Sequence, residues 1–251
     1  MFSPDKKCQT GAEESSGSIC RGIDGYAILN IEHKFLFVKW GLSYLTIYCW
    51  VLQFIQRMII REEMRKRGRP LYNEIKATQV ASLILKMNGG KMDLLKCIKL
   101  LYSIEREALN RWMRPVIYDD LYSLQHGQVV SQTLDRAEYR DHQAKSFWSD
   151  CLKTTSDKTI HVTKDCGIDT LSRAEIGLIK EVFENNRGKT PKQLMKEHHN
   201  PALFPEWKDP GSSRIQTKYS DLLTLLGKTE EQVKEFEADL DELANLEALT
   251  R

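Results

Sequence analysis

The hydrophobic pattern of the chain changes near residue 71, and the part that follows has the periodicity of helices. Apolar residues recur there at intervals of three and four, which places them on one face of a helix. We predict helices over residues 74–87, 92–112, 128–139, 145–153, 172–186 and 218–226, one opened by Thr190-Pro191, and a last one after Thr229. Residues 158–163 alternate apolar and polar positions, which predicts one brief strand.

Helix boundaries are marked by residues that satisfy free backbone groups or end the helix. Ser172 with Glu175, and Thr229 with Gln232, have the spacing of a capping box, in which two side chains bond two backbone N–H groups. Asn88-Gly89-Gly90 is typical of a helix end. The last helix is expected to place five apolar residues on one face: Val233, Phe236, Leu240, Leu243 and Leu246. The predicted fold class is mostly α, a compact multi-helix domain over residues 72–251 with at most a short strand pair.

Residues 1–71 are predicted to form an N-terminal extension of a different character. Residues 1–25 combine Gly, Ser, Asp, Lys and Cys without a period, which favours disorder. Residues 35–56 carry Lys39 as their only charge, and this run is long enough to span a bilayer, for which about 20 apolar residues are needed. A basic cluster at residues 57–69 follows, as on the cytoplasmic flank of a membrane helix.

Three interpretations of this extension are open from the sequence. It is a membrane anchor, or it is a signal peptide, although the apolar run starts late and no small-residue cleavage site follows it. In the third interpretation translation begins further downstream, at Met58 or Met64, and the gene start has been placed too early. The lack of organisation in residues 1–30 favours the third interpretation.

Composition excludes several classes of function. Hydrophobic residues make up 41% of the chain and charged residues 29%, so it can bury a core and is not a disordered polyampholyte. The net charge of +2 does not by itself indicate a nucleic-acid partner. The six cysteines include no Cys-x-x-Cys pair, and no Cys/His spacing suits zinc. We therefore expect no metal, no cofactor and no disulfide framework, with Cys97 packed as a small hydrophobic residue.

Four sequence blocks occur in a fixed order and together resemble a known family. Residues 94–106 contain Lys99-Leu-Leu-Tyr102 followed by Glu105 and Arg106. Residues 114–130 contain Arg-Pro, an Asp, an aromatic residue and His-Gly, residues 171–183 a Leu-Ser-x-x-Glu helix, and residues 205–210 the run Pro-Glu-Trp-Lys-Asp-Pro. These blocks resemble the Panacea domain of bacterial and phage antitoxins, which include the SocA-like proteins. Gln128 departs from the family, which usually has proline there.

The resemblance covers residues 72–250 and implies a function. It implies an α-rich Panacea-type fold and an antitoxin that neutralises a cognate toxin, encoded by an adjacent gene, through direct protein–protein binding. It also implies possible delivery of the toxin to a protease such as a Clp-type complex. The alternatives are a DNA-binding autoregulator of the operon and a membrane-anchored interaction protein. The expected location is the cytoplasm, or the inner membrane if residues 35–56 form a genuine anchor.

The chemistry-bearing residues are interpreted as structural or partner-binding, and we predict that the protein is not an enzyme. His126 beside Asp119 and Asp120 suggests a general base, but no Ser or Cys nucleophile accompanies it. Tyr102, Glu105 and Arg106 are expected to join their helix to the Asp120 loop in one hydrogen-bond network. Further structural motif residues are Lys99, His199, Glu206, Trp207 and Asp209. The predicted partner-binding residues are Tyr118, Tyr122, His126, Gly127 and Gln128.

Overall fold

The chain divides into two compact units, Met1–Glu63 and Met64–Arg251. The structure is a computed structural model, and it describes residues 19–21, 26–31, 34–39, 72–138 and 146–250. In the first unit, β1 (Ile19–Arg21), β2 (Tyr26–Ile31) and β3 (Lys34–Lys39) form an antiparallel sheet in the order β1-β2-β3.

This sheet corrects one prediction and bears on one of the open interpretations. Residues 19–21 are a strand where disorder was predicted, and residues 35–39, the start of the run that the membrane-anchor interpretation makes a helix, are a strand. Residues 35–39 include Phe35, Phe37 and Val38, and β-branched and aromatic side chains favour strands. Residues 40–56 and the basic cluster 57–69 lie outside the described residues. Within the described part of the chain, no helix has both the length and the apolar character needed to cross a bilayer.

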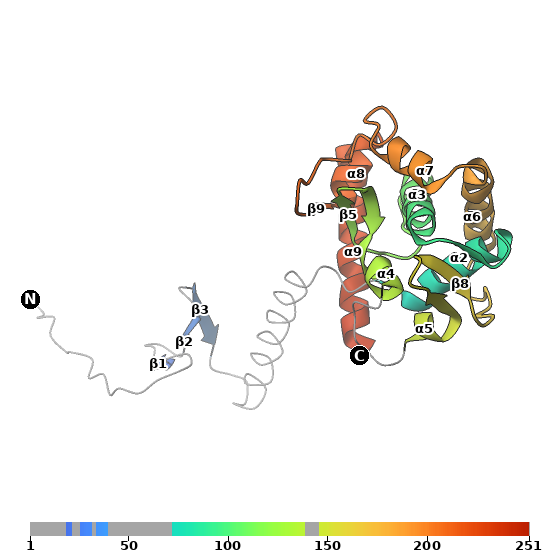
Figure 1. The fold of residues 1–251 in the computed structure, drawn as a ribbon. Helices are drawn as coiled ribbons and strands as arrows, with labels where there is room; N and C mark the ends of the chain where they lie inside the picture. Colours follow the sequence, from blue (N-terminus) through green and yellow to red (C-terminus); the bar gives the residue numbers. More distant parts are fainter. Residues whose placement is uncertain (1–18, 22–25, 32–33, 40–71, 139–145, 251) are drawn as a thin grey trace, which may run out of the picture. The chain divides into compact units, whose positions relative to one another are not determined.

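The second unit is built from helices around α3 (Figure 1). Its helices are α2 (Glu74–Met87), α3 (Leu94–Trp112), α4 (Ser131–Ala137), α5 (Phe147–Cys151), α6 (Arg173–Asn186), α7 (Pro191–His198), α8 (Tyr219–Leu225) and α9 (Glu230–Thr250). Helix α3 contacts α2, α4, α6, α7 and α8. Its apolar stripe, which includes Cys97, Leu101 and Ala108, is fully buried, because each of its sides meets another helix or a strand. The mostly helical fold class and the packing of Cys97 are therefore confirmed.

Two small antiparallel sheets complete the second unit. One has the order β4-β8-β7, from Lys91–Asp93, Thr159–Val162 and Leu152–Thr154. The other has the order β6-β5-β9, from Gly127–Val130, Leu121–Leu124 and Ile215–Thr217. The strand at β8 was predicted, but the β5–β6 hairpin was not, and its second strand occupies residues 127–130 where a helix was predicted. The strands are thus short, as expected, but form more than a single pair.

The predicted helix caps are present with the predicted partners. Glu175 N donates to Ser172 Oγ at 3.2 Å, while Ser172 N donates to the Glu175 carboxylate at 2.8 Å. Thr229 and Gln232 form the equivalent pair of bonds at the start of α9. Pro191 is the first residue of α7. An N–H group at this position would have no partner within the helix, so the missing N–H of proline costs no hydrogen bond. Each cap satisfies donors that the first helical turn leaves free.

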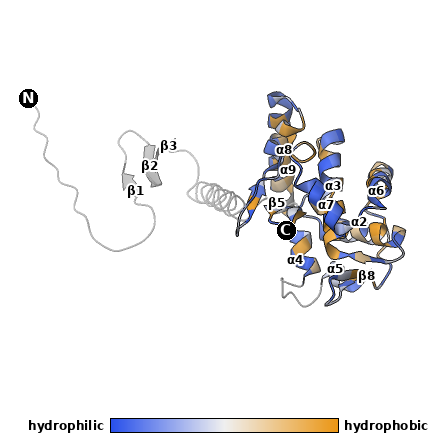
Figure 2. Cartoon of the chain, turned by 45° about the horizontal axis from the view of Figure 1, so that its top comes forward, coloured by the Kyte–Doolittle hydropathy of each residue, from blue (hydrophilic) through white to orange (hydrophobic). Residues whose placement is uncertain are grey.

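The buried face of α9 differs in part from the predicted one. Phe236, Leu240 and Ala244 follow one another at intervals of four and are buried, whereas Leu243 and Leu246 are 40% and 52% exposed. A 3.6-residue helix rotates the 243 and 246 positions away from the line through 236, 240 and 244. Figure 2 shows hydrophobic and hydrophilic stretches alternating along the helices, as expected for helices with one buried side.

Candidate functional site

The Panacea-like motifs converge on one face of α3. Lys99, Tyr102 and Arg106 are spaced three and four residues apart, so they project from the same side of the helix. That side meets two other segments: the start of strand β6, and residues 198–207 at the end of α7 and beyond. We call this set the motif core; its residues are Lys99, Tyr102, Arg106, Gly127, Gln128, His198, His199, Glu206 and Trp207.

Glu206 is the link between α3 and the Pro-Glu-Trp segment. Its carboxylate accepts a hydrogen bond from the Tyr102 hydroxyl at 3.0 Å and pairs with Arg106 Nε at 2.7 Å. Arg106 also donates to the backbone oxygen of Leu203 at 3.1 Å. Glu206 is almost fully buried, with Arg106 as its ion-pair partner. Burial raises the pKa of Tyr102 well above its usual value. The contact therefore fixes the position of a segment that has no regular secondary structure.

The Lys99 side chain of α3 binds the backbone of the β5–β6 hairpin at strand β6. Its side chain is 0% exposed, and Nζ donates to the backbone oxygen of Gln128 at 2.5 Å. Among the described residues no carboxylate forms an ion pair with Lys99, and burial lowers its pKa to about 7. Gly127 permits this approach: its φ is +88°, and a Cβ there would lie 2.9 Å from Lys99 Nζ and 3.0 Å from His198 Cβ. A side chain at residue 127 would therefore displace the lysine or the helix end.

The two adjacent histidines are packed between rings. His198 is stacked on Phe204 with ring centroids 4.1 Å apart, and His199 packs on Trp207 at 4.3 Å. Burial, with the positive charges of Lys99 and Arg106, lowers the pKa of His198 to about 2. Burial and Lys99 also lower the pKa of His199. Both rings are therefore neutral near pH 7, and they act in packing.

Gln128 and Trp207 join the hairpin to the Pro-Glu-Trp segment. With its amide oriented to satisfy both partners, Gln128 donates to His198 O at 3.1 Å and accepts from Trp207 N at 3.0 Å. The Trp207 indole N–H donates to Leu124 O at 3.2 Å. A proline at 128 would lack the side-chain amide that makes two of these bonds.

The predicted network of Tyr102, Glu105 and Arg106 is in fact two networks. Tyr102 and Arg106 bind Glu206, as described above, and not the Asp120 loop. Glu105 lies on another side of α3, because one residue rotates a helix by about 100°. It is fully buried and accepts from the backbone N–H groups of Val116 and Ile117 at 2.9 and 2.7 Å. Burial raises its pKa to about 8.

Asp119 is a second buried carboxyl group beside Glu105. Asp119 accepts from the backbone N–H groups of Gln132 and Thr133 at 2.8 and 2.9 Å and so holds the start of α4. Burial raises its pKa to about 7. Asp120, predicted to be the network partner, is half-buried and accepts from the side chain of Gln132 at 3.2 Å.

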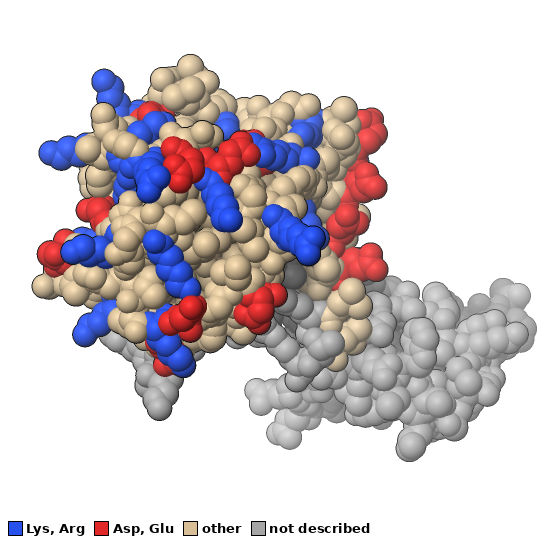
Figure 3. All heavy atoms as spheres, turned by 90° about the vertical axis from the view of Figure 1, so that its right-hand side faces the viewer, with Lys and Arg blue, Asp and Glu red and all other residues tan. Residues whose placement is uncertain are grey.

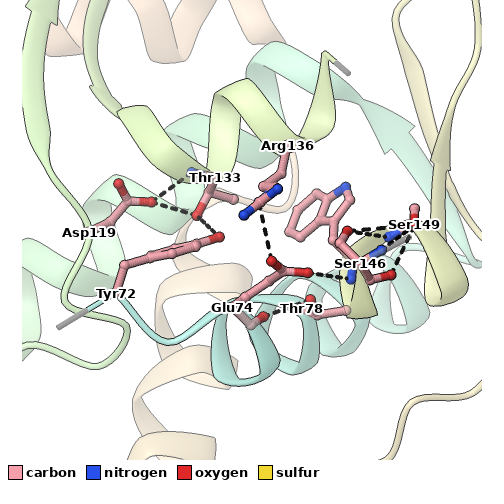
Figure 4. Close-up of polar contacts among 9 residues, drawn as sticks. Tyr72, Glu74, Thr78, Asp119, Thr133, Arg136, Ser146 and Ser149 are labelled. Carbon is pink, nitrogen blue, oxygen red and sulfur yellow. Dashed lines mark hydrogen bonds and ion pairs between the residues drawn. The ribbon is translucent and has the colours of Figure 1, made fainter. Parts of the chain in front are cut away.

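A further polar network was not predicted from the sequence. Glu74, in the first turn of α2, accepts from Trp148 N at 3.0 Å and pairs with Arg136 Nε at 3.1 Å (Figure 4). The same view shows Asp119, Thr133 and Tyr72 linked side by side (Figure 4). Glu74 thus connects the two described segments that flank residues 139–145. Its partners are more than 60 positions away, so spacing in the sequence gave no signal.

The five predicted partner-binding residues do not form one accessible surface. His126 is exposed at the hairpin tip, but Gly127 and Gln128 are buried, so Gln128 cannot contact a partner directly. Tyr122 is half-buried, with the Arg214 guanidinium 4.9 Å from its ring centre. Tyr118 is half-buried and has a φ of +57°. Burial raises its pKa, and Arg114 offsets part of this effect. The prediction of accessible residues around Gly127 was therefore wrong for Gln128.

The accessible residues above the motif core come from two neighbouring segments. They are Gln125 and His126 at the hairpin tip, and Leu203, Pro205 and Lys208 beside Trp207. Lys208 N contacts Ser123 Oγ at 3.4 Å, which adds a second bridge between the segments, and Leu203 is 50% exposed. We call this set the tip surface. Asp209, the last motif residue, accepts from Gly211 N at 2.9 Å and shapes the turn that follows.

Surface charge is unevenly distributed over the described residues. On the face shown in Figure 3, Lys and Arg side chains are spread widely, while Asp and Glu lie along one edge and in small groups. The acidic residues of α9 include Glu230, Glu231, Glu235 and Glu242, and Lys234 is a basic residue among them.

In the described ranges, no three His, Cys, Asp or Glu side chains are grouped as metal ligands would be.

A comparison with protein families finds one family model that is similar to part of this domain. Residues 97–208 match a family model of antitoxins, a range that contains the whole motif core. The family is described as antitoxin SocA-like, Panacea domain. The chain is therefore similar to this family over residues 97–208, and the resemblance inferred from the motifs is confirmed there. Comparisons with curated proteins and with solved structures find no match.

Proposed function

We propose that this protein neutralises a cognate toxin by binding it directly through the tip surface. The observation that carries the proposal is the match of residues 97–208 to the Panacea antitoxin family. The motif core supports the location, because it fixes two irregular segments against α3 through buried contacts. A surface fixed before binding loses less conformational entropy when the partner binds.

The partner is expected to be the product of a gene adjacent to this one. A stable interface buries on the order of 1,600 Å² in total. A few anchors carry most of the energy of such an interface. Leu203 is the largest apolar residue of the tip surface, Trp207 of the motif core lies beside it and is half-buried, and His126 is exposed at the hairpin tip. We expect these three to include the anchors.

The test compares two leucines of equal exposure. Leu203 is 50% exposed in the tip surface, and Leu225 is 49% exposed at the end of α8. Leu203→Asp should weaken binding of the neighbouring gene's product at least tenfold, which is about 1.4 kcal/mol, while Leu225→Asp should leave it unchanged. Isothermal titration with the full chain measures both, and melting temperatures confirm that both variants fold. Equal loss in the two variants would place the interface elsewhere, and no association of the wild types at micromolar concentration would refute direct binding.

We further propose that neutralisation involves no catalysis by this chain. His126 is exposed without a nucleophile in hydrogen-bond reach among the described residues, and His199 is packed on Trp207. His126→Ala should protect cells from the toxin whenever it still binds the toxin normally. A stable variant that binds but does not protect would contradict this. Salt-dependent binding to operator DNA would instead favour the autoregulator alternative.

A further inference from the structure

Helix α9 carries exposed leucines along its C-terminal half. This helix runs along one side of the second unit (Figure 1). Leu243, Leu246 and Leu249 are 40%, 52% and 76% exposed, and they follow one another at intervals of three residues. Residues spaced in this way are neighbours on the surface of a helix, so the three side chains form one apolar strip.

These leucines differ from the other large apolar side chains that are exposed among the described residues. The others lie one to a helix or strand, or in loops, and they are Ile75, Trp112, Ile168, Leu203, Ile215 and Leu225. Single apolar side chains are ordinary on a protein surface, whereas a group of them marks a place where another molecule binds. The exposed side of α9 is therefore a candidate for an interaction surface.

Acidic side chains line the same side of α9. Glu242, Asp239 and Glu235 precede Leu246 by four, seven and eleven residues, intervals that return to one side of a helix with 3.6 residues per turn. All three are exposed, and among the described residues no Lys or Arg pairs with them. Lys234, the basic residue of the helix, lies on another side. We call the whole set the α9 strip; its residues are Glu235, Asp239, Glu242, Leu243, Leu246 and Leu249.

The charge of the α9 strip selects among the molecules that bind to an apolar surface. Nucleic acid and anionic lipid headgroups carry negative charge, so the carboxylates repel them. The strip of a second copy carries the same charges, and two strips that face each other would bring carboxylates together. A helix with lysine or arginine beside its apolar side is complementary in both respects, because its apolar residues cover the leucines while its charges meet the carboxylates.

We propose that the α9 strip is a second interaction surface and that it binds a basic amphipathic helix of a partner protein. The strip extends from Glu235 to Leu249, which is about 21 Å along the helix axis at a rise of about 1.5 Å per residue. A partner helix of about four turns matches this length, with apolar residues at intervals of three and four. None of the strip residues belongs to the tip surface, so this inference goes beyond the binding of a toxin there.

The two components of the α9 strip respond differently to salt. Attraction between its carboxylates and a basic helix weakens as salt screens the charges, over a Debye length that falls from about 30 Å at 0.01 M to about 8 Å at 0.15 M. Burial of the leucines does not depend on charge. The complex should therefore weaken as salt is added but should not be abolished.

The experiment titrates the full chain with a synthetic peptide of about 14 residues, four turns of helix, that contains only leucine and lysine. In the test peptide the leucines recur at intervals of three and four. In a control peptide of the same composition leucine and lysine alternate, so a helix of it has no apolar side. Fluorescence anisotropy of a dye on each peptide measures binding. We expect the test peptide to bind about tenfold more tightly than the control peptide.

A matched pair of leucine variants locates the apolar contact. Leu243→Ala should weaken binding of the test peptide by about fivefold or more, because a side chain in the centre of the strip is truncated. Leu225 at the end of α8 is 49% exposed and lies outside the strip, so Leu225→Ala should leave binding unchanged. Melting temperatures verify that both variants fold.

A matched pair of charge variants locates the ionic contact. Asp239→Asn combined with Glu242→Gln should weaken binding by about threefold or more, because two carboxylates of the strip are neutralised. Glu230→Gln combined with Glu237→Gln removes the same charge from the opposite side of α9 and should have a smaller effect. The comparison separates the strip from the net charge of the helix.

Three results would overturn the proposal. Equal binding of the two peptides would show that an apolar helix side is not recognised. Equal loss in the two charge variants would reduce the attraction to net charge. A wild-type dimer at micromolar concentration that Leu243→Asp dissociates, measured by sedimentation, would assign the strip to a second copy of the chain. None of these measurements uses the product of the neighbouring gene, so their outcome is independent of toxin binding.

Discussion

Replacing Gly127 by alanine should destabilise the second unit more than the same change at Gly90. The two glycines have almost the same φ, +88° and +87°, a region in which a side chain costs about 1–2 kcal/mol. A Cβ at residue 90 would meet nothing within 4 Å, but a Cβ at residue 127 would lie 2.9 Å from Lys99 Nζ and 3.0 Å from His198 Cβ. Overpacking of this kind costs a further amount of about 1–3 kcal/mol.

The difference between the two variants isolates the crowding. The effect of alanine on the entropy of the unfolded chain is the same at both positions and cancels. We therefore expect Gly90→Ala to lower the free energy of unfolding by about 1–2 kcal/mol and Gly127→Ala by about 2–5 kcal/mol. Urea titration followed by circular dichroism should separate the two midpoints by about 0.5–1.5 M, which is the difference of about 1–3 kcal/mol divided by an m of about 2 kcal/mol per M.

Equal destabilisation of the two variants would refute the reasoning, because the close approach of Lys99 to residue 127 would then contribute nothing. A second measurement tests the same contact from the other side. Lys99→Met removes the amine that a Cβ would meet, so Gly127→Ala should cost less in that background than in the wild type. The double-mutant cycle shows whether the two positions are coupled.

Three other outcomes are expected. The pKa of Glu105 is about 8 in the folded protein and near 4.5 unfolded, so the folded state holds an extra proton between these values. The stability that this proton contributes is fully present below pH 4.5. As the pH rises from 4.5 to 8, the free energy of unfolding falls by up to about 1.4 kcal/mol per pH unit. Glu105→Gln should remove this slope when unfolding is measured over a range of pH. Tyr102→Phe should cost about 1.5–3 kcal/mol of unfolding free energy, because Glu206 loses a donor to a buried charge; an unchanged urea midpoint would exclude this role. A chain that begins at Met64 should fold with the helical circular dichroism of residues 72–250, since Met64–Arg251 is a compact unit, and absence of helix would contradict this.

Local signals in the sequence predicted most of the helices. The capping boxes at Ser172 and Thr229 and the proline at residue 191 each act within a few residues, so their spacing alone indicates the helix start. The β5–β6 hairpin was missed because all four residues of β6 are buried. A fully buried strand shows no alternation of apolar and polar residues, so its period gives no signal in the sequence.

The composition of the motif core was predicted in part, but its connections were not. Lys99, Tyr102, Arg106, Glu206 and Trp207 were all singled out from the sequence. Tyr102 and Glu206 are 104 residues apart, and spacing on one helix cannot show which distant group a side chain meets. The separation of Glu105 from Arg106 follows from helix geometry alone, but their different partners required the fold.

The position of the motif core beneath the tip surface has a consequence for how partners can change. Residues that hold the two segments in place point inward, while Gln125, His126 and Leu203 point outward and make no side-chain hydrogen bond among the described residues. If the tip surface binds the toxin as proposed, substitutions at the outer positions would alter what the protein recognises at little expense in stability. The requirements of folding and of recognition would then fall on different residues.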